Sequence, residues 1–294
     1  MKNFSIVKNW KIFFAITLIF LLIGYGSMIF RGFNLGIDFT GGSIMDLGFA
    51  REVKITEVRE VLSRHDLGGA IIQLESDDAA ATSARGVLIR TPVIADNDRT
   101  QVMADMEKSL GKFEIHRVEN VGATIGGELI QQAAIAVFLS WVLMILYITI
   151  RFQWNFAVAA IIALIIDVSV TLSWFSLMQL EVDSTFIAAL LTVVGYSVNG
   201  TIVIFDRIRE NLKIHRRSET ITEMIDHSIF STLTRTVYTT ITTLFAIVAI
   251  FLFGGETIHN FSFAMLVGVC SGCYTSVLLA GTMWLFLQHK KAGE

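Results

Sequence analysis

The chain has 294 residues, of which 53% are apolar and only 17% are charged, and its mean hydropathy is +0.63. A soluble globular protein needs more charge than this on its surface, so the composition excludes that class and predicts a membrane protein. The formal net charge of −3 carries little information, because the charged residues are unevenly distributed along the chain.

Six stretches are long and apolar enough to cross a bilayer, which requires about 20 mostly apolar residues. They are Ile12–Phe30, Ala133–Ile150, Phe156–Met178, Ser184–Phe205, Thr236–Phe253 and Phe261–Leu287. The first stretch follows three lysines, as a signal peptide would. It is too long for a signal sequence and lacks a clear cleavage site, so we expect it to remain as a span.

Among the termini and the short connections between spans, lysine and arginine occur on one predicted side only. They occupy the N-terminus, the turn at Arg151, the segment 206–235 and the C-terminal Lys290 and Lys291. The opposite short connections, Gln179–Asp183 and Gly254–Asn260, contain neither residue. The positive-inside rule therefore predicts cytoplasmic termini. The predicted organisation is an N-terminus with the first span (1–30), an outer domain (31–132), a five-helix bundle (133–287) with a cytoplasmic loop (206–235), and a tail (288–294).

The polar segment 31–132 alternates strand and helix patterns. The expected strands are Gly42–Leu47, Ala70–Leu74, Val87–Arg90 and Phe113–Val118, and the expected helices are Thr56–His65 and Arg99–Leu110. The order β-α-β-β-α-β is that of a ferredoxin-like domain, in which two helices cover one face of a four-stranded sheet. The fold class is therefore a six-helix membrane protein with one extracytoplasmic α+β domain.

A glycine-rich turn connects the first span to this domain. Gly36, Gly41 and Gly42 permit a tight turn into the first strand, and Asp38 is placed to cap or pin it. We expect the turn to act as a hinge that transmits motion between membrane and outer domain.

Four segments of the chain carry a resemblance to a known family. They are Phe33–Gly42, Val121–Leu129, Val194–Asn211 (VGYSVNGTIVIFDRIREN), and Thr234–Thr236 followed by Phe253–Gly255. Together they resemble the SecD/SecF family of protein-export membrane proteins, within the resistance-nodulation-division superfamily. The resemblance covers nearly the whole chain, and the third segment is its most specific part.

The resemblance implies a subunit of the Sec translocase in the cytoplasmic membrane. Its implied partners are SecD, the SecYEG channel, YajC, the unfolded preprotein and membrane lipid, with no nucleic acid. It implies late, ion-gradient-linked movement and release of preproteins, while ATP is used by a separate motor. The sequence contains no phosphate-binding loop, and we expect no enzymatic activity, cofactor or metal.

Asp167 and Arg235 are the leading ion-relay candidates. Asp167 lies mid-span, where a carboxylate costs roughly 2.5–3.5 kcal/mol and should face the bundle interior. It is either a protonatable relay group, which the matching family aspartate favours, or a structural hydrogen-bonding group. Arg235 is either an interfacial arginine of the positive-inside type or, as the resemblance implies, a partner for an intramembrane carboxylate.

Gly200 departs from the family pattern, which has aspartate at the matching position. Three explanations remain open. Asp167 or a carboxylate on SecD carries the coupling; or oxygens of Asn199, Ser197 and Thr201 supply a different ion path; or coupling is weak or absent. Close helix packing by small residues is the alternative role of Gly195, Ser197 and Gly200.

Two other segments have simpler interpretations. Asp206, Arg207 and Arg209 begin a charged helical stretch, which is either a solvated face with local ion pairs or a docking site for SecD or the channel. Gly268 and Gly272 form a small-residue pattern typical of helix packing. Cys270 and Cys273 lie in an apolar helix, where a redox role is not expected.

The sequence is compatible with three functions. The first is an export subunit acting with SecD, and the second is a structural subunit without its own ion coupling. The third is half of a small-molecule or lipid exporter of the same superfamily, although such exporters carry larger outer domains.

Overall fold

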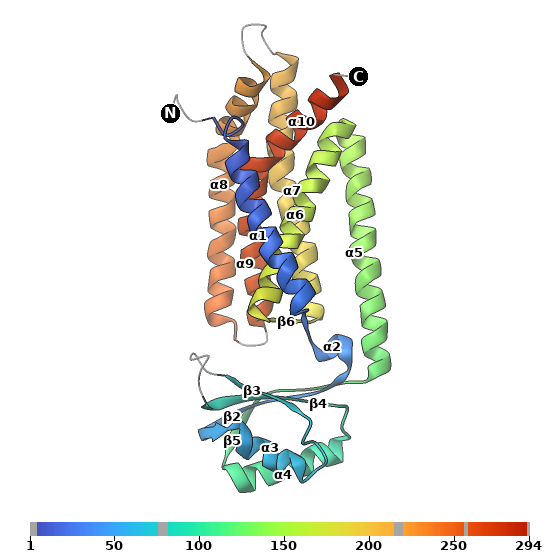
Figure 1. The fold of residues 1–294 in the computed structure, drawn as a ribbon, viewed down its shortest axis with the longest axis vertical. Coiled ribbons are helices and arrows are strands. Elements are labelled where there is room, and N and C mark those ends of the chain that lie inside the picture. Colours follow the sequence, from blue (N-terminus) through green and yellow to red (C-terminus); the bar gives the residue numbers. More distant parts are fainter. Residues whose placement is uncertain (1–4, 76–81, 215–219, 256–257, 293–294) are drawn as a thin grey trace. The chain divides into compact units, whose positions relative to one another are not determined.

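A computed structural model describes residues 5–75, 82–214, 220–255 and 258–292 (Figure 1). The chain forms two compact units, one of residues 1–34 with 135–294 and one of residues 35–134. The second unit covers the segment for which the sequence predicts an outer domain. Lys2, Arg216 and Arg217, which contribute to the predicted orientation, lie outside the described residues.

The first unit is helical. Its elements are α1 (Trp10–Phe30), α5 (Ala123–Arg151, shared with the second unit), α6 (Trp154–Met178), α7 (Ser184–Lys213), α8 (Ile221–Phe253), α9 (His259–Tyr274), a π-helical turn η2 (Thr275–Ala280) and α10 (Gly281–Ala292). In the described part of the chain, six segments are long and apolar enough to span a membrane, with α9, η2 and α10 forming the last. The predicted spans are confirmed.

The segment predicted as the loop 206–235 is mostly helix. α7 continues to Lys213, and α8 begins at Ile221, well before its apolar part. Thr220 starts α8 with a capping box, because its hydroxyl accepts from the Glu223 backbone N–H (3.3 Å) and the Glu223 carboxylate accepts from the Thr220 backbone N–H (3.0 Å). Hydropathy locates the membrane part of a helix, whereas capping residues set where it begins.

Close contacts between small residues hold the bundle together. A Cβ added to Gly24 of α1 would lie 2.0 Å from the Ser173 hydroxyl oxygen of α6, and one added to Gly268 of α9 would lie 2.3 Å from a methyl of Val193 of α7. These helices therefore approach at distances that only glycine allows. The predicted packing role of Gly268 is confirmed.

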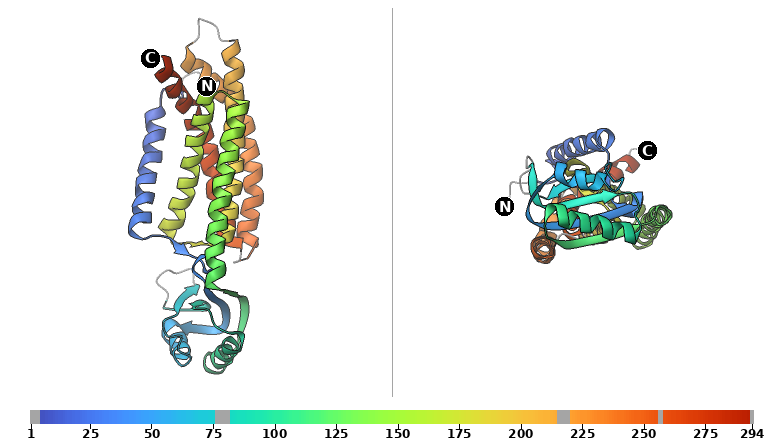
Figure 2. Two further views of the ribbon diagram at one scale, coloured as in Figure 1. Left: turned by 90° about the vertical axis from the view of Figure 1, so that its right-hand side faces the viewer. Right: turned by 90° about the horizontal axis from the view of Figure 1, so that it is seen from below.

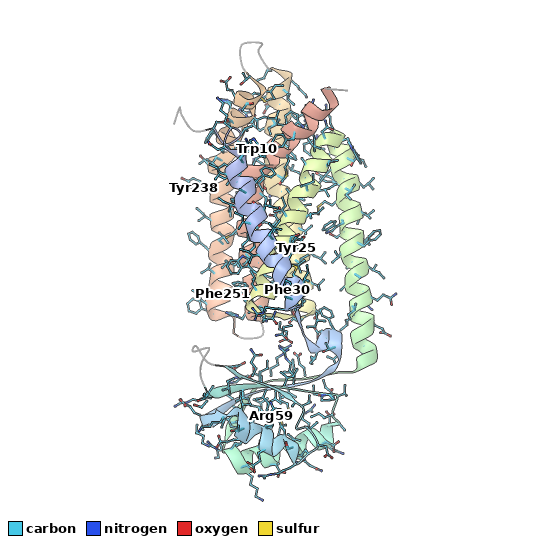
Figure 3. The ribbon with its side chains drawn as sticks, in the orientation of Figure 1. Trp10, Tyr25, Phe30, Arg59, Tyr238 and Phe251 are labelled. Carbon is cyan, nitrogen blue, oxygen red and sulfur yellow. The ribbon has the colours of Figure 1, made fainter. Side chains whose placement is uncertain are left out.

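The outside of the bundle is apolar. Figure 3 shows Phe30 and Tyr238 pointing away from their helices, and their side chains are 90% and 66% exposed. Only 6% of the most apolar stretch of α5 is buried within the chain, compared with 56% of the corresponding stretch of α6. Such surfaces suit contact with hydrocarbon or with another membrane subunit, because water would solvate them poorly.

Asp226 of α8 holds the N-terminal segment. Its carboxylate accepts from the backbone N–H groups of Ile6 (3.0 Å) and Val7 (3.1 Å) and from the Ser5 hydroxyl. Ile6 and Val7 are 3% and 4% exposed, so these amides are shielded from water. The segment before α1 is thus tied to a residue more than 200 positions away in the sequence.

Replacing Asp226 with alanine is expected to release this segment, because it leaves buried amide donors unsatisfied at about 1–3 kcal/mol in total. Hydrogen exchange at Ile6 and Val7 should accelerate strongly. The matched control is Asp206→Ala, which breaks an exposed ion pair with Arg209 and should leave exchange at these amides unchanged. Unaltered protection in the Asp226 variant would show that these hydrogen bonds do not hold the N-terminal segment.

The second unit is an antiparallel sheet with two helices on one face (Figure 2). Its elements are α2 (Ile37–Thr40), β2 (Gly42–Lys54), α3 (Ile55–Ser63), β3 (Ile71–Glu75), β4 (Ser83–Thr91), α4 (Asp96–Leu110) and β5 (Phe113–Val121), and the sheet order is β3-β4-β2-β5. Two short strands lie outside this sheet: β1 (Asn34–Leu35), where the chain passes from the first unit to the second, and β6 (Glu181–Val182), in the first unit. The predicted β-α-β-β-α-β order is confirmed.

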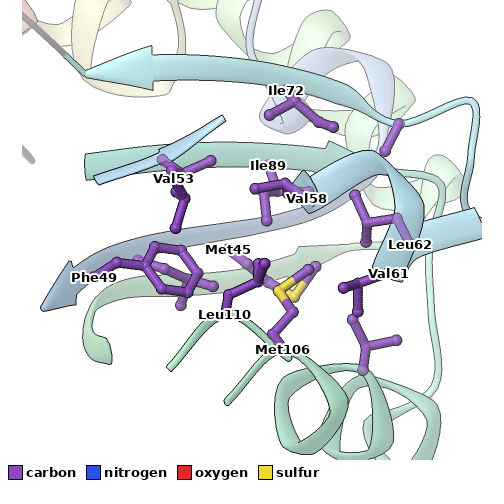
Figure 4. Close-up of a cluster of buried hydrophobic side chains, with 14 of the residues drawn as sticks. Met45, Phe49, Val53, Val58, Val61, Leu62, Ile72, Ile89, Met106 and Leu110 are labelled. Atoms are coloured by element: carbon purple, nitrogen blue, oxygen red, sulfur yellow. The ribbon is translucent and has the colours of Figure 1, made fainter. Parts of the chain in front are cut away.

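The core of this unit lies between the sheet and the helices α3 and α4. Figure 4 shows Met45 and Phe49 of β2 and Ile89 of β4 facing Leu62 of α3 and Met106 of α4. Alternate residues of β2 point to the opposite face, so Asp46 and Gly48 lie on the face that the two helices leave open. The strand β2 is longer than predicted, because pairing with β4 resumes at Val53 after an irregularity beyond Gly48.

Candidate functional site

Asp167 lies in α6 with no exposed surface. One of its carboxylate oxygens, Oδ1, accepts from the Ser271 hydroxyl at 2.7 Å, and the Thr275 hydroxyl lies 2.9 Å from both Oδ1 and Oδ2. The Ser197 hydroxyl donates to Oδ2. We call Asp167, Ser197, Ser271 and Thr275 the aspartate cluster. Three neutral donors hold this carboxyl group, and no cation in the described part of the chain contacts it.

Three helices supply the cluster. Asp167 comes from α6, Ser197 from α7, and Ser271 and Thr275 from α9 and its continuation. Thr275 is the first residue of the π-helical turn, a distortion that is often found at functional sites. Gly272 permits the close approach, because a Cβ there would lie 3.0 Å from the Ser197 side chain.

Sequence reasoning singled out Asp167 and Ser197 but missed Ser271 and Thr275. The available signal was their spacing of four residues, which places two hydroxyls on one face of an otherwise apolar span. Serine and threonine are common in membrane helices, so the spacing alone did not distinguish them from packing residues.

A second polar site lies beside the first. A cavity of about 50 Å³ is lined by Asn199 and Gly200 of α7 and by Arg235 and Thr236 of α8, among others. Asn199 and Arg235 are exposed, whereas Thr236 is buried. We call it the arginine cavity. It is bordered by Gly272 and Cys273, which adjoin Ser271 of the aspartate cluster in the sequence.

Thr201 belongs to neither site. Its hydroxyl pairs with that of Ser276 at 2.9 Å, and both residues are buried. A Cβ on Gly200 would lie 3.0 Å from the same Ser276 oxygen. The sequence candidates are therefore divided. Asp167 and Ser197 share one site, Asn199, Gly200 and Arg235 share another, and Thr201 pairs with Ser276 instead.

Arg235 is not a partner of Asp167 within this chain. Among residues 5–75, 82–214, 220–255 and 258–292, no ion pair forms at Arg235. The carboxylate of Asp167 contacts hydroxyls instead. An arginine that lines a cavity next to Gly200 remains available to a carboxylate from another chain.

The variant Gly200→Asp tests whether the arginine cavity accepts a carboxylate. The nearest atoms to the added Cβ belong to the Ser276 side chain, at 3.0 and 3.5 Å, and Arg235 lines the same space. In thermal unfolding of the detergent-solubilised chain, a double-mutant cycle with Arg235→Ala should give a favourable coupling of about 1 kcal/mol.

The matched control for that cycle is Gly200→Asn, which has the same size without the charge. Its coupling to Arg235→Ala should stay below about 0.5 kcal/mol. Equal coupling for asparagine and aspartate would show that the guanidinium does not reach the added group.

The charged residues after the α7 span pair locally. Asp206 bonds Arg209 at 2.9 Å and Arg207 bonds Glu210 at 2.7 Å, each three residues apart on the helix. Arg207 also donates to the Ser231 hydroxyl (3.1 Å), and Arg209 donates to the Arg151 carbonyl (3.3 Å). The interpretation as a face with local ion pairs is supported, and a docking role stays a prediction.

The glycine turn has the backbone geometry that the sequence suggested at two of its glycines. Gly41 has φ +69° and ψ +160°, and Gly42 has φ +137°, regions that L side chains rarely adopt. A Cβ on Gly42 would also lie 2.6 Å from the Thr91 carbonyl oxygen. Gly36 has an ordinary φ of −70° and precedes α2, and Asp38 lies in the first turn of that helix rather than at its cap.

One packing prediction was wrong. A Cβ on Gly195 would meet no atom within 4 Å, so this glycine allows no close approach within the described chain. Gly195 is exposed in the described chain. Cys270 and Cys273 are free thiols.

Comparison with known proteins identifies the family to which this chain belongs. The model of the C-terminal region of the protein-export membrane proteins SecD/SecF matches residues 101–290, and the model of the SecD/SecF GG motif matches residues 26–53. A protein translocase subunit SecF from Acidaminococcus fermentans is 65% identical over 99% of this chain and 99% of that protein. The chain belongs to the SecF family. A SecF from Haemophilus influenzae is 38% identical over 93% of this chain and 83% of that protein.

Solved structures agree with the SecF assignment. The crystal structure of SecDF from Thermus thermophilus, a translocon-associated membrane protein, matches 97% of this chain with a TM-score of 0.87 and 34% identity. A SecDF structure in the super-membrane-facing form matches the whole chain with a TM-score of 0.71. The chain spans about two fifths of each SecDF chain, 39% and 40%. The GG motif includes Gly41 and Gly42, the two glycines with positive φ.

Proposed function

We propose that this translocase subunit acts with SecD in ion-gradient-linked movement and release of preproteins, and that the aspartate cluster is its proton-binding site. The observation that carries the proposal is the fully buried Asp167 carboxyl group, which contacts three hydroxyls and no cation among the described residues. Ionisable groups inside a membrane are costly and are typical of ion pathways.

Proton binding at Asp167 would change how three helices are connected. An ionised carboxylate only accepts hydrogen bonds, so all three hydroxyls must donate to it. A protonated carboxyl group donates one bond, and at least one hydroxyl of α7 or α9 must then turn to another acceptor. Because the donors lie on different helices, gain and loss of the proton would bias the packing of α6 against α7 and α9.

The remaining parts of the proposal concern orientation and partners. The basic connections favour cytoplasmic termini and an outer position for residues 35–134. The nearly bare surface of α5 and the arginine cavity support contact with a second membrane subunit, for which SecD is the candidate. The SecYEG channel, YajC, the preprotein and lipid complete the expected assembly.

Reconstitution tests the proposal. Proteoliposomes that contain this chain, SecD, the channel and its ATP-driven motor should translocate a preprotein faster with an imposed proton gradient than without one, at constant ATP. A rate independent of the gradient would favour the second candidate function, a structural subunit. The second candidate function is favoured by Gly200, because glycine provides no side chain to bind an ion.

A further inference from the structure

Three potential metal ligands converge on the open face of the four-stranded sheet in the second unit. Asp46 lies on the central strand β2, Glu75 ends the edge strand β3, and His116 lies on the opposite edge strand β5. One ligand atom from each residue lies within 4.8 Å of the others. The site already proposed lies in the other unit of the chain, so the two are independent.

Two glycines make this convergence possible. Gly48 and Gly86 are cross-strand partners on β2 and β4. A Cβ on Gly48 would lie 2.6 Å from Nε2 of His116, and a Cβ on Gly86 would lie 2.6 Å from Oε2 of Glu75. The two long side chains therefore lie flat over bare backbone and reach toward Asp46 from both edges of the sheet.

Two acidic side chains and two arginines share this part of the open face. The Asp46 side chain is only 4% exposed, and its Oδ1 lies 3.3 Å from Nδ1 of His116. Arg117, directly opposite Asp46, pairs with Glu119 at 2.6 Å, which offsets its positive charge. Arg90, on β4, shares the same face of the sheet. Two carboxylates and an imidazole form a set of mixed oxygen and nitrogen donors.

We propose that Asp46, Glu75 and His116 bind a divalent transition-metal ion, with Zn²⁺ as the best fit. Zinc accepts carboxylate oxygen and imidazole nitrogen at about 2.0–2.2 Å, and three protein ligands with one open position form a common zinc site. Tetrahedral bonds of that length separate ligand atoms by roughly 3.3 Å, which the His116–Asp46 distance already matches. The remaining separations between ligand atoms, which are at most 4.8 Å, must shorten toward this value when the ion binds.

Such an ion would connect both edges of the sheet. Glu75 and His116 lie on the two edge strands, and Asp46 lies on a strand between them. The bound ion would stabilise the second unit by mass action, since the unfolded chain does not bring the three ligands together.

The experiment uses the full chain in detergent, freed of metal by a chelator, with Zn²⁺ and Co²⁺ as probes. Calorimetry should give one Zn²⁺ per chain with a dissociation constant below about 100 µM. Bound Co²⁺ should show the strong visible absorption of a site with few ligands. Zn²⁺ should raise the thermal unfolding midpoint of the second unit by about 4 °C or more.

Variants separate this site from adventitious binding. His116→Ala and Glu75→Gln should each weaken binding at least about tenfold. Gly48→Ala keeps all three ligands but displaces the imidazole, so it should weaken binding even if a ligand variant fails to fold. The matched control is His65→Ala, since His65 pairs with Asp105 at 2.8 Å without a third ligand in the described chain.

Two results would overturn the proposal. One is the absence of Zn²⁺ binding up to about 100 µM. The other is binding that His116→Ala, Glu75→Gln and Gly48→Ala leave unchanged. In either case the cluster is a histidine–aspartate ion pair with a neighbouring glutamate.

Discussion

Asp167→Asn is expected to remove the gradient-dependent component of preprotein translocation, at least about tenfold, while ATP-driven translocation continues. Asparagine keeps the size of the side chain but cannot take up or release a proton at physiological pH. The measurement is the translocation rate in the reconstituted system with and without an imposed proton gradient. Full gradient stimulation in this variant would exclude Asp167 as the relay group.

The variant must be separated from a folding defect. The carboxamide presents a donor to one of the cluster's hydroxyls, which is expected to cost about 1–3 kcal/mol in unfolding free energy. The matched control is Thr171→Val on the same helix, whose hydroxyl bonds the Asp167 main-chain carbonyl at 2.9 Å and does not contact the carboxyl group. Thr171→Val removes a buried hydroxyl close to Asp167 and should leave the gradient dependence intact.

Gly42→Val is expected to destabilise the second unit by about 3 kcal/mol or more, and export should fall with it. Valine would have to adopt φ +137°, and its Cβ would meet the Thr91 carbonyl oxygen at 2.6 Å. Backbone strain of this kind costs about 1–3 kcal/mol, and the clash with rigid backbone adds to it. Thermal unfolding and hydrogen exchange of β2 and β4 amides in the full chain would measure the loss.

Two further glycine variants calibrate this result. Gly41→Ala also places an L side chain in a rarely adopted backbone region (φ +69°, ψ +160°), and alanine is smaller than valine, so its effect should be smaller than that of Gly42→Val. Gly69 does not have a positive φ, and a Cβ there would meet no atom within 4 Å. The variant Gly69→Ala should therefore change the free energy of unfolding by less than about 1 kcal/mol. A Gly42 variant as stable as the Gly69 variant would show that the turn can rearrange.

Local patterns in the sequence determined most of the architecture. Runs of apolar residues located all six spans, because the hydrocarbon core imposes a length and a composition on any helix that crosses it. Periods of two and of three to four residues predicted the β-α-β-β-α-β order of the second unit. Paired glycines at Gly41 and Gly42 indicated a turn that other residues cannot adopt, and both have positive φ.

Only the tertiary structure decided which polar residues meet. Ser271 and Thr275 reach Asp167 across more than 100 positions of sequence, while Asn199 and Arg235 face a separate cavity. Two neighbours on one helix can face different partners, because each residue turns the helix by about 100° and the rotation of each helix is set by packing. Hydropathy is nearly the same all around a membrane helix, so the sequence showed where the helices are but not which sides face one another.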